Sequence, residues 1–306
     1  MKRLLKYPKY KFFVHLFFVC ASLLSLIPFL LIISISLSHE VDVVRNGFKL
    51  IPEHFTLEAY RYAFGNGRVI LDAYAVTAIY AVCGSLLSVI LTAMIAYALS
   101  NDNYVLKKPI TYFLLFTMFF NGGLIPSYII NTQWFHLGNN VLMYLLYGLI
   151  GAYTVFVFRT FFKSIPQSLI DAAYIDGATE TQVLLKVIIP LSVPVLATFA
   201  FMNLIGRWNS YDVSMYYMQN ERLYTLQYVL QNLLNEAAYL KQMKESMPGL
   251  NITVPPSETL KFAMCIVTTG PMLMVFPYFQ KYFSKGMMLG AVKGRSEEHT
   301  SELQSQ

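Results

Sequence analysis

Charged side chains are scarce in this chain of 306 residues. Only 13% are Asp, Glu, Lys or Arg, whereas 56% are hydrophobic and the mean hydropathy is +0.49. Because soluble domains usually carry about 25% charged residues, the composition excludes an ordinary globular domain and predicts a polytopic membrane protein. Cysteine is also scarce. The three cysteines, Cys20, Cys83 and Cys265, lie inside apolar stretches and have no metal-binding or disulfide spacing, so we expect no metal site.

Catalytic signatures are missing as well. No G-x-x-x-x-G-K-[ST] loop occurs, so the chain is not expected to bind or hydrolyse ATP itself, and we expect no cofactor. The five histidines are scattered, without an H-E-x-x-H or G-x-S-x-G motif, which argues against a membrane-embedded enzyme. An ion-coupled secondary carrier would need intramembrane carboxylates, yet Asp72 and Asp212 lie at the boundaries of apolar stretches. Both classes remain the alternatives.

Long apolar runs are what the sequence has in abundance. A helix needs about 20 residues to cross the hydrocarbon layer, and six runs reach that length. They predict an all-α fold of six transmembrane helices, at about 12–37, 71–99, 110–130, 140–162, 191–211 and 261–283. The run that begins at Phe12 is too long for a cleaved signal peptide, so we expect an uncleaved first helix.

The distribution of charge predicts the orientation of this bundle. If both termini are cytoplasmic, the inner segments hold thirteen basic and four acidic residues, and the outer segments hold nine basic and ten acidic ones. Basic residues favour the cytoplasmic side. We therefore expect a multi-pass protein of the cell membrane with both termini, the first being residues 1–11, in the cytoplasm. The basic excess then needs no nucleic-acid partner.

The last twelve residues differ from everything before them. The segment 295–306, RSEEHTSELQSQ, is polar, without apolar periodicity, and it resembles the translation of a sequencing adapter. We predict a membrane domain over 12–294 followed by a non-native tail over 295–306. An ordinary polar C-terminus is the alternative, which the codons of the gene would distinguish.

Two segments on the predicted outer side remain open to two interpretations. In MFFNGGLIPSYII, the residues Gly122, Gly123 and Pro126 interrupt the third apolar run, either as a bend in the transport pathway or as a helix that ends at the interface. Leucines at spacings of three and four over 223–240 predict an amphipathic helix. That helix either carries a partner or covers the bundle's own outer end.

The residues 163–190, here called the docking element, form a short polar segment between two apolar runs. A Ser164–Gln167 spacing and a Thr179–Gln182 spacing each match a capping box, which predicts two short helices. Leu169, Ile170 and Ala173 are expected to share one face. Gly177 permits a sharp turn between the helices, and Pro190 is expected to close the element where the chain re-enters the lipid. A rigid exposed angle of this kind predicts a docking site for a soluble partner.

The spacing within the docking element resembles a known motif. Asp171–Ala173, then Gly177, then Ile189-Pro190 resemble the EAA loop of permease subunits of binding-protein-dependent ABC importers, although that motif usually starts with Glu. FRTFFKSIP, PLSVPVLATFAFMNLIGRWNSY and KYFSKGMMLGAVKG resemble the maltose-type carbohydrate permeases, and MFFNGGLIPSYII is similar to the branch linked to lipoproteins and complex oligosaccharides. The likeness covers about residues 10–294.

This resemblance implies a permease subunit that forms half of a transmembrane pathway for a carbohydrate, an oligosaccharide in that branch. The implied partners are a second permease subunit in a heterodimer, two ATPase subunits that bind the ATP, and an extracytoplasmic solute-binding lipoprotein. The residues expected to couple the chain to an ATPase subunit are Leu169, Asp171, Ala172, Ala173, Asp176, Gly177 and Pro190. A second ATPase contact is expected near the C-terminal end, at Lys285, Gly286, Lys293 and Gly294.

The group Arg207, Trp208 and Asn209 at the end of the fifth apolar run also has two interpretations. Trp faces and Asn amides suit sugar rings, so Trp208 and Asn209 are candidate pathway residues together with Gly122, Gly123 and Pro126. Trp and Arg also collect at membrane edges, and the sequence favours this anchoring role.

Overall fold

The computed structural model describes the backbone of residues 8–65, 67–247 and 255–304, and the side chains of 11–65, 67–247 and 255–282. The described chain is helical, apart from loops and one isolated bridge between Ser38 and Phe55. It divides into two compact units, which are described separately. Unit 1 comprises 1–70 and 229–270, and unit 2 comprises 71–228 and 271–306.

Unit 1 contains the first long helix and two short ones: α1 (Pro8–Ser36), α2 (Glu40–Asn46) and α3 (Glu58–Ala63). The apolar window of α1 has none of its residues buried within the chain, so this helix presents apolar side chains on every side. Most of α13 (Leu226–Ser246) also lies in this unit, and it confirms the predicted amphipathic helix. Its apolar face buries Leu230 and Ala237 within the chain.

A carboxylate from α2 fixes the start of α14 (Ser257–Gln304) inside unit 1. The Glu40 side chain accepts hydrogen bonds from the backbone N–H groups of Glu258 at 2.8 Å and Thr259 at 2.9 Å, and from the Thr259 hydroxyl at 2.9 Å. The first N–H groups of a helix lack partners within the helix, and the helix dipole favours a negative charge there. Glu40 therefore supplies from a distant segment a cap that the local sequence does not.

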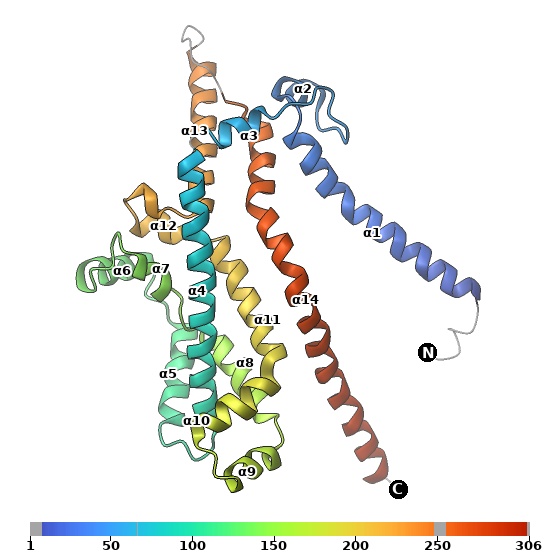
Figure 1. The fold of residues 1–306 in the computed structure, drawn as a ribbon, viewed down its shortest axis with the longest axis vertical. Helices are drawn as coiled ribbons and strands as arrows, with labels where there is room; N and C mark the ends of the chain where they lie inside the picture. Colours follow the sequence, from blue (N-terminus) through green and yellow to red (C-terminus); the bar gives the residue numbers. More distant parts are fainter. Residues whose placement is uncertain (1–7, 66, 248–254, 305–306) are drawn as a thin grey trace. The chain divides into compact units, whose positions relative to one another are not determined.

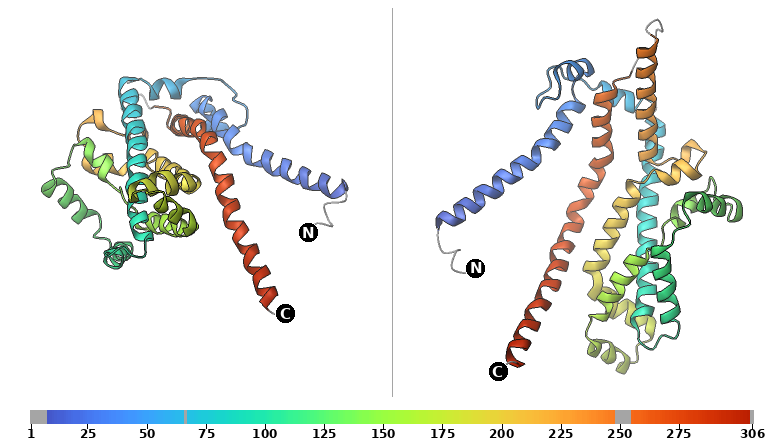
Figure 2. Two further views of the ribbon diagram at one scale, coloured as in Figure 1. Left: turned by 60° about the horizontal axis from the view of Figure 1, so that its bottom comes forward. Right: turned by 180° about the vertical axis from the view of Figure 1, so that it is seen from behind.

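Unit 2 is built around α4 (Gly67–Ser100), which continues into it from unit 1. The helices α5 (Lys107–Phe119), α8 (Ala152–Lys163) and α11 (Ile189–Trp208) lie beside α4, and the short helices α9 (Gln167–Ile175) and α10 (Glu180–Val183) lie at one end of them (Figure 1; Figure 2, right, shows the reverse side). An apolar cluster joins these helices at that end. Its largest fully buried members are Phe158, Phe162, Leu99, Ile188, Val155 and Val183.

A second cluster joins α7 (Val141–Leu146) to α12 (Asp212–Tyr217) and to α4. The Tyr144 hydroxyl lies 2.7 Å from the Ser214 hydroxyl and donates to the carbonyl of Leu223 at 2.6 Å. The rings of Tyr80 and Tyr144 are 4.9 Å apart. Asn140 caps α7 by accepting the N–H of Leu142 at 2.9 Å. Buried tyrosines with satisfied hydroxyls therefore define this part of unit 2.

Within the part of the chain that the structure describes, four continuous helices are long and apolar enough to cross a membrane: Lys11–Ser36, Gly67–Ser100, Glu180–Trp208 and Ser257–Tyr282. They match the first, second, fifth and sixth predicted spans. The helix Glu180–Trp208 and α14 run through their internal prolines, Pro194, Pro271 and Pro277, without a break. Cys20, Cys83 and Cys265 are free thiols within these helices.

The third predicted span is interrupted at Gly122 and Gly123, as its sequence indicates, whereas the fourth is not the continuous helix that was predicted. The third ends at Phe119 and resumes at Leu124 as α6 (Leu124–Ile129) and a π-helical turn, η2 (Ile130–Trp134), bent by 119°. Gly123 adopts a φ of +84°, which L side chains rarely adopt. The fourth is divided into α7 and α8 by residues 147–151, where Gly148 has a φ of +59°. The described chain thus has four continuous candidate spans, or five if the bent pair counts as one.

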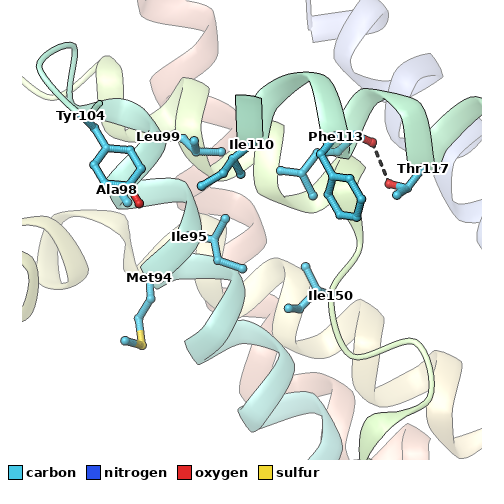
Figure 3. A pocket seen from close by; sticks show the side chains of 10 residues that line it. Met94, Ile95, Ala98, Leu99, Tyr104, Ile110, Phe113, Thr117 and Ile150 are labelled. Carbon is cyan, nitrogen blue, oxygen red and sulfur yellow. Dashed lines mark hydrogen bonds between the residues drawn. The ribbon is translucent and has the colours of Figure 1, made fainter. Parts of the chain in front are cut away.

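An apolar cavity of about 580 Å³ lies between α4, α5 and Ile150 (Figure 3). The hydroxyl of Thr117 is among its few polar groups, and it donates to the carbonyl of Leu114 at 2.7 Å. A sugar-binding site needs several polar groups that are free to form hydrogen bonds with the sugar. This cavity suits an acyl chain or an apolar side chain better than a carbohydrate.

The backbone of α14 continues through Gln304, and so includes most of the predicted tail over 295–306. The assignment of the tail as non-native sequence stays a prediction. The side chains of Lys285, Gly286, Lys293 and Gly294, expected at a second ATPase contact, lie outside the described residues.

Candidate docking element

The first helix of the docking element begins later than its capping pattern predicts. Ser164 is the C-terminal cap of α8, where its hydroxyl donates to the carbonyl of Phe161 at 2.7 Å, and Pro166 precedes the first residue of α9. The predicted Ser164–Gln167 capping box is therefore wrong. A serine hydroxyl readily bonds the backbone of its own preceding turn, and that local bond replaces the cap.

The turn after α9 is a Schellman motif with Gly177 in the left-handed conformation, at φ +81°. The N–H of Ala178 donates to the carbonyl of Ala173 at 2.9 Å, and the N–H of Gly177 donates to that of Tyr174 at 3.0 Å. No atom lies within 4 Å of the position that a Cβ would take at Gly177. The structure therefore needs glycine here for its backbone angle rather than for space, as the sequence predicts.

The second helix of the docking element starts at the predicted capping box. The hydroxyl of Thr179 accepts the N–H of Gln182 at 3.4 Å, and the side chain of Gln182 accepts the N–H of Thr179 at 2.9 Å. These reciprocal bonds satisfy two N–H groups that would otherwise lack partners at the helix start. Two local motifs, on either side of Gly177, thus fix the angle between α9 and α10.

Pro190 does not close the element, which corrects the sequence prediction. The helix runs from Glu180 through a π-helical turn, η3 (Leu184–Ile188), into α11 without interruption. Proline lacks an N–H and collides with the carbonyl four residues earlier in a regular helix. The wider π turn directly before Pro190 accommodates this residue, so the docking element and the fifth span form one continuous rod.

The helix α9 has one half-buried face and one exposed face. Ile170 and Ala173 pack against the apolar cluster of unit 2, together with the buried Val183 and Leu184 from the next helix. Leu169, predicted to share that face, is instead 45% exposed. The exposed residues of the element include Asp171, Ala172, Ile175, Asp176 and Gly177. Ile175, a large apolar side chain at the end of α9, is 86% exposed, while the opposite face of this helix packs against the cluster.

Polar contacts join the element to the turn after α4. Asp102 forms ion pairs with Lys107 and with Lys163, the latter at 2.8 Å, and the hydrogen bonds from these lysines lower the pKa of Asp102 to about 2. The Tyr97 hydroxyl donates to the Glu180 carboxylate at 2.6 Å. The sequence analysis missed Tyr97, Asp102 and Glu180, because their partners other than Lys107 are 61 or 83 residues away in the sequence.

These polar residues border a cavity of about 570 Å³ between the turn after α4, the end of α8 and α9. Asp171, a predicted coupling residue, lines this cavity and accepts a hydrogen bond from Gln167 at 3.0 Å within its own helix. Its carboxylate keeps acceptor capacity for a basic group from outside. The element therefore combines a rigid backbone, an exposed apolar tip and exposed carboxylates.

The candidate pathway residues lie in two places with different surroundings. Gly122 and Gly123 lie in the bend between α5 and α6, and Pro126 lies in the first turn of α6. The helix α6 contacts α12 through the stacked rings of Tyr128 and Tyr217. Trp208 is 6% exposed and its ring lies 6.3 Å from that of Tyr74, while Asn209 is the cap residue after α11. Arg207 is also 6% exposed. The predicted anchoring role at the membrane edge is therefore wrong for Arg207 and Trp208, because both are buried in protein.

Comparison with known proteins assigns the chain to a family. Residues 103–289 match the model of the binding-protein-dependent transport system inner membrane component. The chain belongs to this family. The matched range contains the docking element, both broken spans and the fifth span.

Relatives of the same kind match over nearly the full length. The polygalacturonan/rhamnogalacturonan transport system permease protein YtcP of Bacillus subtilis is 32% identical, over 92% of this chain and 97% of its own. Protein LplC of the same organism is 30% identical, over 89% and 90% of the two chains. A solved chain of a bacterial ABC transporter, involved in the import of the acidic polysaccharide alginate, is 29% identical with a TM-score of 0.74, over 90% of this chain and 98% of its own. The chain is thus an inner-membrane transport component, not an enzyme.

Proposed function

We propose that this chain forms half of the transmembrane pathway of an ABC importer for an oligosaccharide and couples to a separate ATPase through the docking element. The observation that carries the proposal is the build of that element. Two short helices meet at a fixed angle, pack one face against the apolar cluster of unit 2 and present Asp171, Ala172 and Ile175 outward. Such a protrusion fits a groove in a soluble partner.

The helices that flank the element explain how docking becomes movement. The helix α8 ends at Lys163, the first residue of the element, and the helix that begins inside the element at Glu180 continues beyond it to Trp208. Because both helices are rigid and share a buried cluster, a displacement of α9 by a closing ATPase would tilt them together. No reaction chemistry is needed in this chain, since the ATPase supplies the free energy.

We further propose six crossings with both termini in the cytoplasm. The bent pair of α5 and α6 would be the third crossing, and α7 with α8 would be the fourth, divided at 147–151. This arrangement places the docking element and the turn at 101–106 on the same side of the membrane, consistent with the ion pairs of Asp102. The excess of basic residues in the inner segments supports that side as cytoplasmic.

The substrate class rests on the relatives. Their names specify polygalacturonan or rhamnogalacturonan, arabinooligosaccharides in the 27% identical permease AraQ of Halalkalibacterium halodurans, and alginate in the structural neighbour. All are chains of several sugars, which supports an oligosaccharide here. The proposed partners are a second permease, two ATPase subunits and an extracytoplasmic binding lipoprotein, with Lys285–Lys293 as a second ATPase contact.

Reconstitution tests this proposal. The chain would be purified with its genomic partner permease and ATPase, placed in proteoliposomes and supplied with the binding protein. We expect uptake of labelled oligosaccharides only with ATP in the compartment that holds the ATPase. The matched control contains an ATPase that cannot hydrolyse ATP. Uptake at the full rate with that control, or without any ATPase, would overturn the proposal.

A further inference from the structure

Arg207 is a buried cation in unit 2. It lies in the last turn of α11, its side chain is only 6% exposed, and no carboxylate of the described residues lies within ion-pair distance of it. Its Nε atom is buried without a hydrogen-bond partner. Buried charges are normally paired, and ionisable groups within membrane spans are usually functional. This arginine therefore needs an explanation.

The two hydrogen bonds of the Arg207 guanidinium go to the end of α7 and to the break that follows it. Nη1 donates to the carbonyl of Tyr144 at 3.0 Å, and Nη2 donates to that of Gly148 at 3.4 Å. The guanidinium carbon lies 5.3 Å from the centre of the Tyr80 ring. Irregular backbone at membrane depth requires other protein groups to satisfy it. The forked guanidinium does so at two carbonyls of the broken span.

A glycine on α4 makes room for this contact. A Cβ added at Gly84 would lie 2.7 Å from Nη1 and 2.9 Å from the central carbon of the Arg207 guanidinium. Side-chain atoms essentially never approach so closely. Gly84 therefore lets α4 lie directly against the guanidinium, and Arg207 joins α4, the end of α7, the break and α11 at one point.

The position of this junction along the chain gives it a mechanical meaning. The helices α8 and α11 leave the docking element as the two arms of a hairpin. Arg207 is near the far end of the second arm, and Gly148 is just beyond the far end of the first. The hairpin is thus closed at both ends: by the docking element at one end and by the Arg207 contacts at the other.

We infer that Arg207 is a positioning residue for transport. Its contacts hold the far ends of α8 and α11 together, so that the two helices move as one rigid body. This inference rests on the proposed function. When the docking element is displaced, the segment 144–148 follows α11 instead of separating from it. Without the contacts of Arg207, α8 and α11 would diverge at the break, and ATP hydrolysis would continue with less movement of the pathway.

Substitutions with a matched control test the inference in the reconstituted complex. Lysine at 207 cannot reach both carbonyls with a planar fork, so Arg207→Lys should assemble and hydrolyse ATP but transport about tenfold less solute per ATP. Gly84→Ala should do the same by displacing the guanidinium. Gly206→Ala is the control, because it also adds a methyl group to a helix, but no atom lies within 4 Å of the new Cβ. This variant should transport normally.

A distance measurement separates this role from a general loss of stability. Spin labels at Leu142 on α7 and Met202 on α11, both more than half exposed, report on the junction in a background without native cysteines. In the parent complex, ATP binding should leave their separation unchanged, whereas in Arg207→Lys it should change.

An unchanged separation together with normal transport per ATP in Arg207→Lys would overturn the inference and leave the proposed function intact. Loss of ATP dependence in the parent complex would instead overturn the proposed function.

Discussion

The two ends of the α8–α11 hairpin are built in opposite ways. At the docking element, neighbouring residues fix the geometry: a Schellman turn at Gly177 and a capping box between Thr179 and Gln182. At the far end, Arg207 reaches carbonyls 59 and 63 residues away in sequence. The docking element is exposed, whereas the Arg207 side chain at the far end is buried in protein.

The difference follows from what each end must do. A docking surface has to keep its shape while it faces water, and local backbone motifs give that rigidity without a large core. A break in a span lies where water is absent, so its carbonyls need donors from elsewhere in the fold. We therefore expect substitutions at the docking end to act through backbone geometry, and those at the far end to act through lost long-range contacts.

The largest effect should come from Gly177→Pro. Proline has a fixed φ near −65°, and Gly177 has a φ of +81°, so the turn between α9 and α10 cannot form. Membrane insertion should persist, while transport and the stimulation of the ATPase should be abolished, as measured by uptake and phosphate release.

Gly177→Asn is the matched control for that variant. Asparagine adopts the left-handed conformation more readily than other side chains, and no atom lies within 4 Å of the added Cβ. It should keep most of the transport activity. If proline is tolerated as well as asparagine, the exposed end does not act through its backbone angle.

A smaller effect is expected from Thr179→Ala, which removes the capping box of α10. Loss of such a cap destabilises a helix start by about 1 kcal/mol. Because α10 continues into α11, the loss should fray only its first turn and reduce ATPase stimulation several-fold. Thr181→Ala is the matched control, because Thr181 lies two residues after Thr179 and takes no part in the capping box. Equal activity of the two variants would show that the cap contributes nothing to coupling.

The smallest effect is expected from Asp102→Asn. The ion pairs with Lys107 and Lys163 lower the pKa of Asp102 from 3.8 to about 2, so their stabilisation is complete above about pH 4 and is lost as the pH falls through 2. Exposed ion pairs contribute little and are screened by salt. Uptake by the Asp102→Asn complex should be less than twofold below uptake by the parent complex, and this ratio should not change between pH 5 and pH 8. A strong pH dependence in this range would assign Asp102 a larger role.

The sequence predicted what depends on composition and on nearby residues. The helical fold, four continuous spans, the turn at Gly177 and the Thr179–Gln182 cap follow from hydropathy and local spacing. The divided fourth span was missed because 147–151 (YGLIG) has no charged residue or proline to mark a break, and hydropathy does not register the backbone angle of Gly148. The contact between Gly84 and Arg207 could not be predicted, because the two residues are distant in the sequence and meet only in the folded chain. In the sequence alone, an arginine beside a tryptophan resembles a pair that anchors a helix at the membrane interface.

Cross-linking from the tip of α9 tests the central claim most directly. Ile175→Cys places a thiol at a position that is 86% exposed, and Tyr239→Cys places one at 62% exposure on α13, on the proposed outer side. In intact membranes with the partner subunits present, a short bifunctional reagent should join residue 175, and not residue 239, to the ATPase subunit and stop uptake. If residue 175 gives no ATPase product while uptake stays ATP-driven, the docking element is not the coupling site.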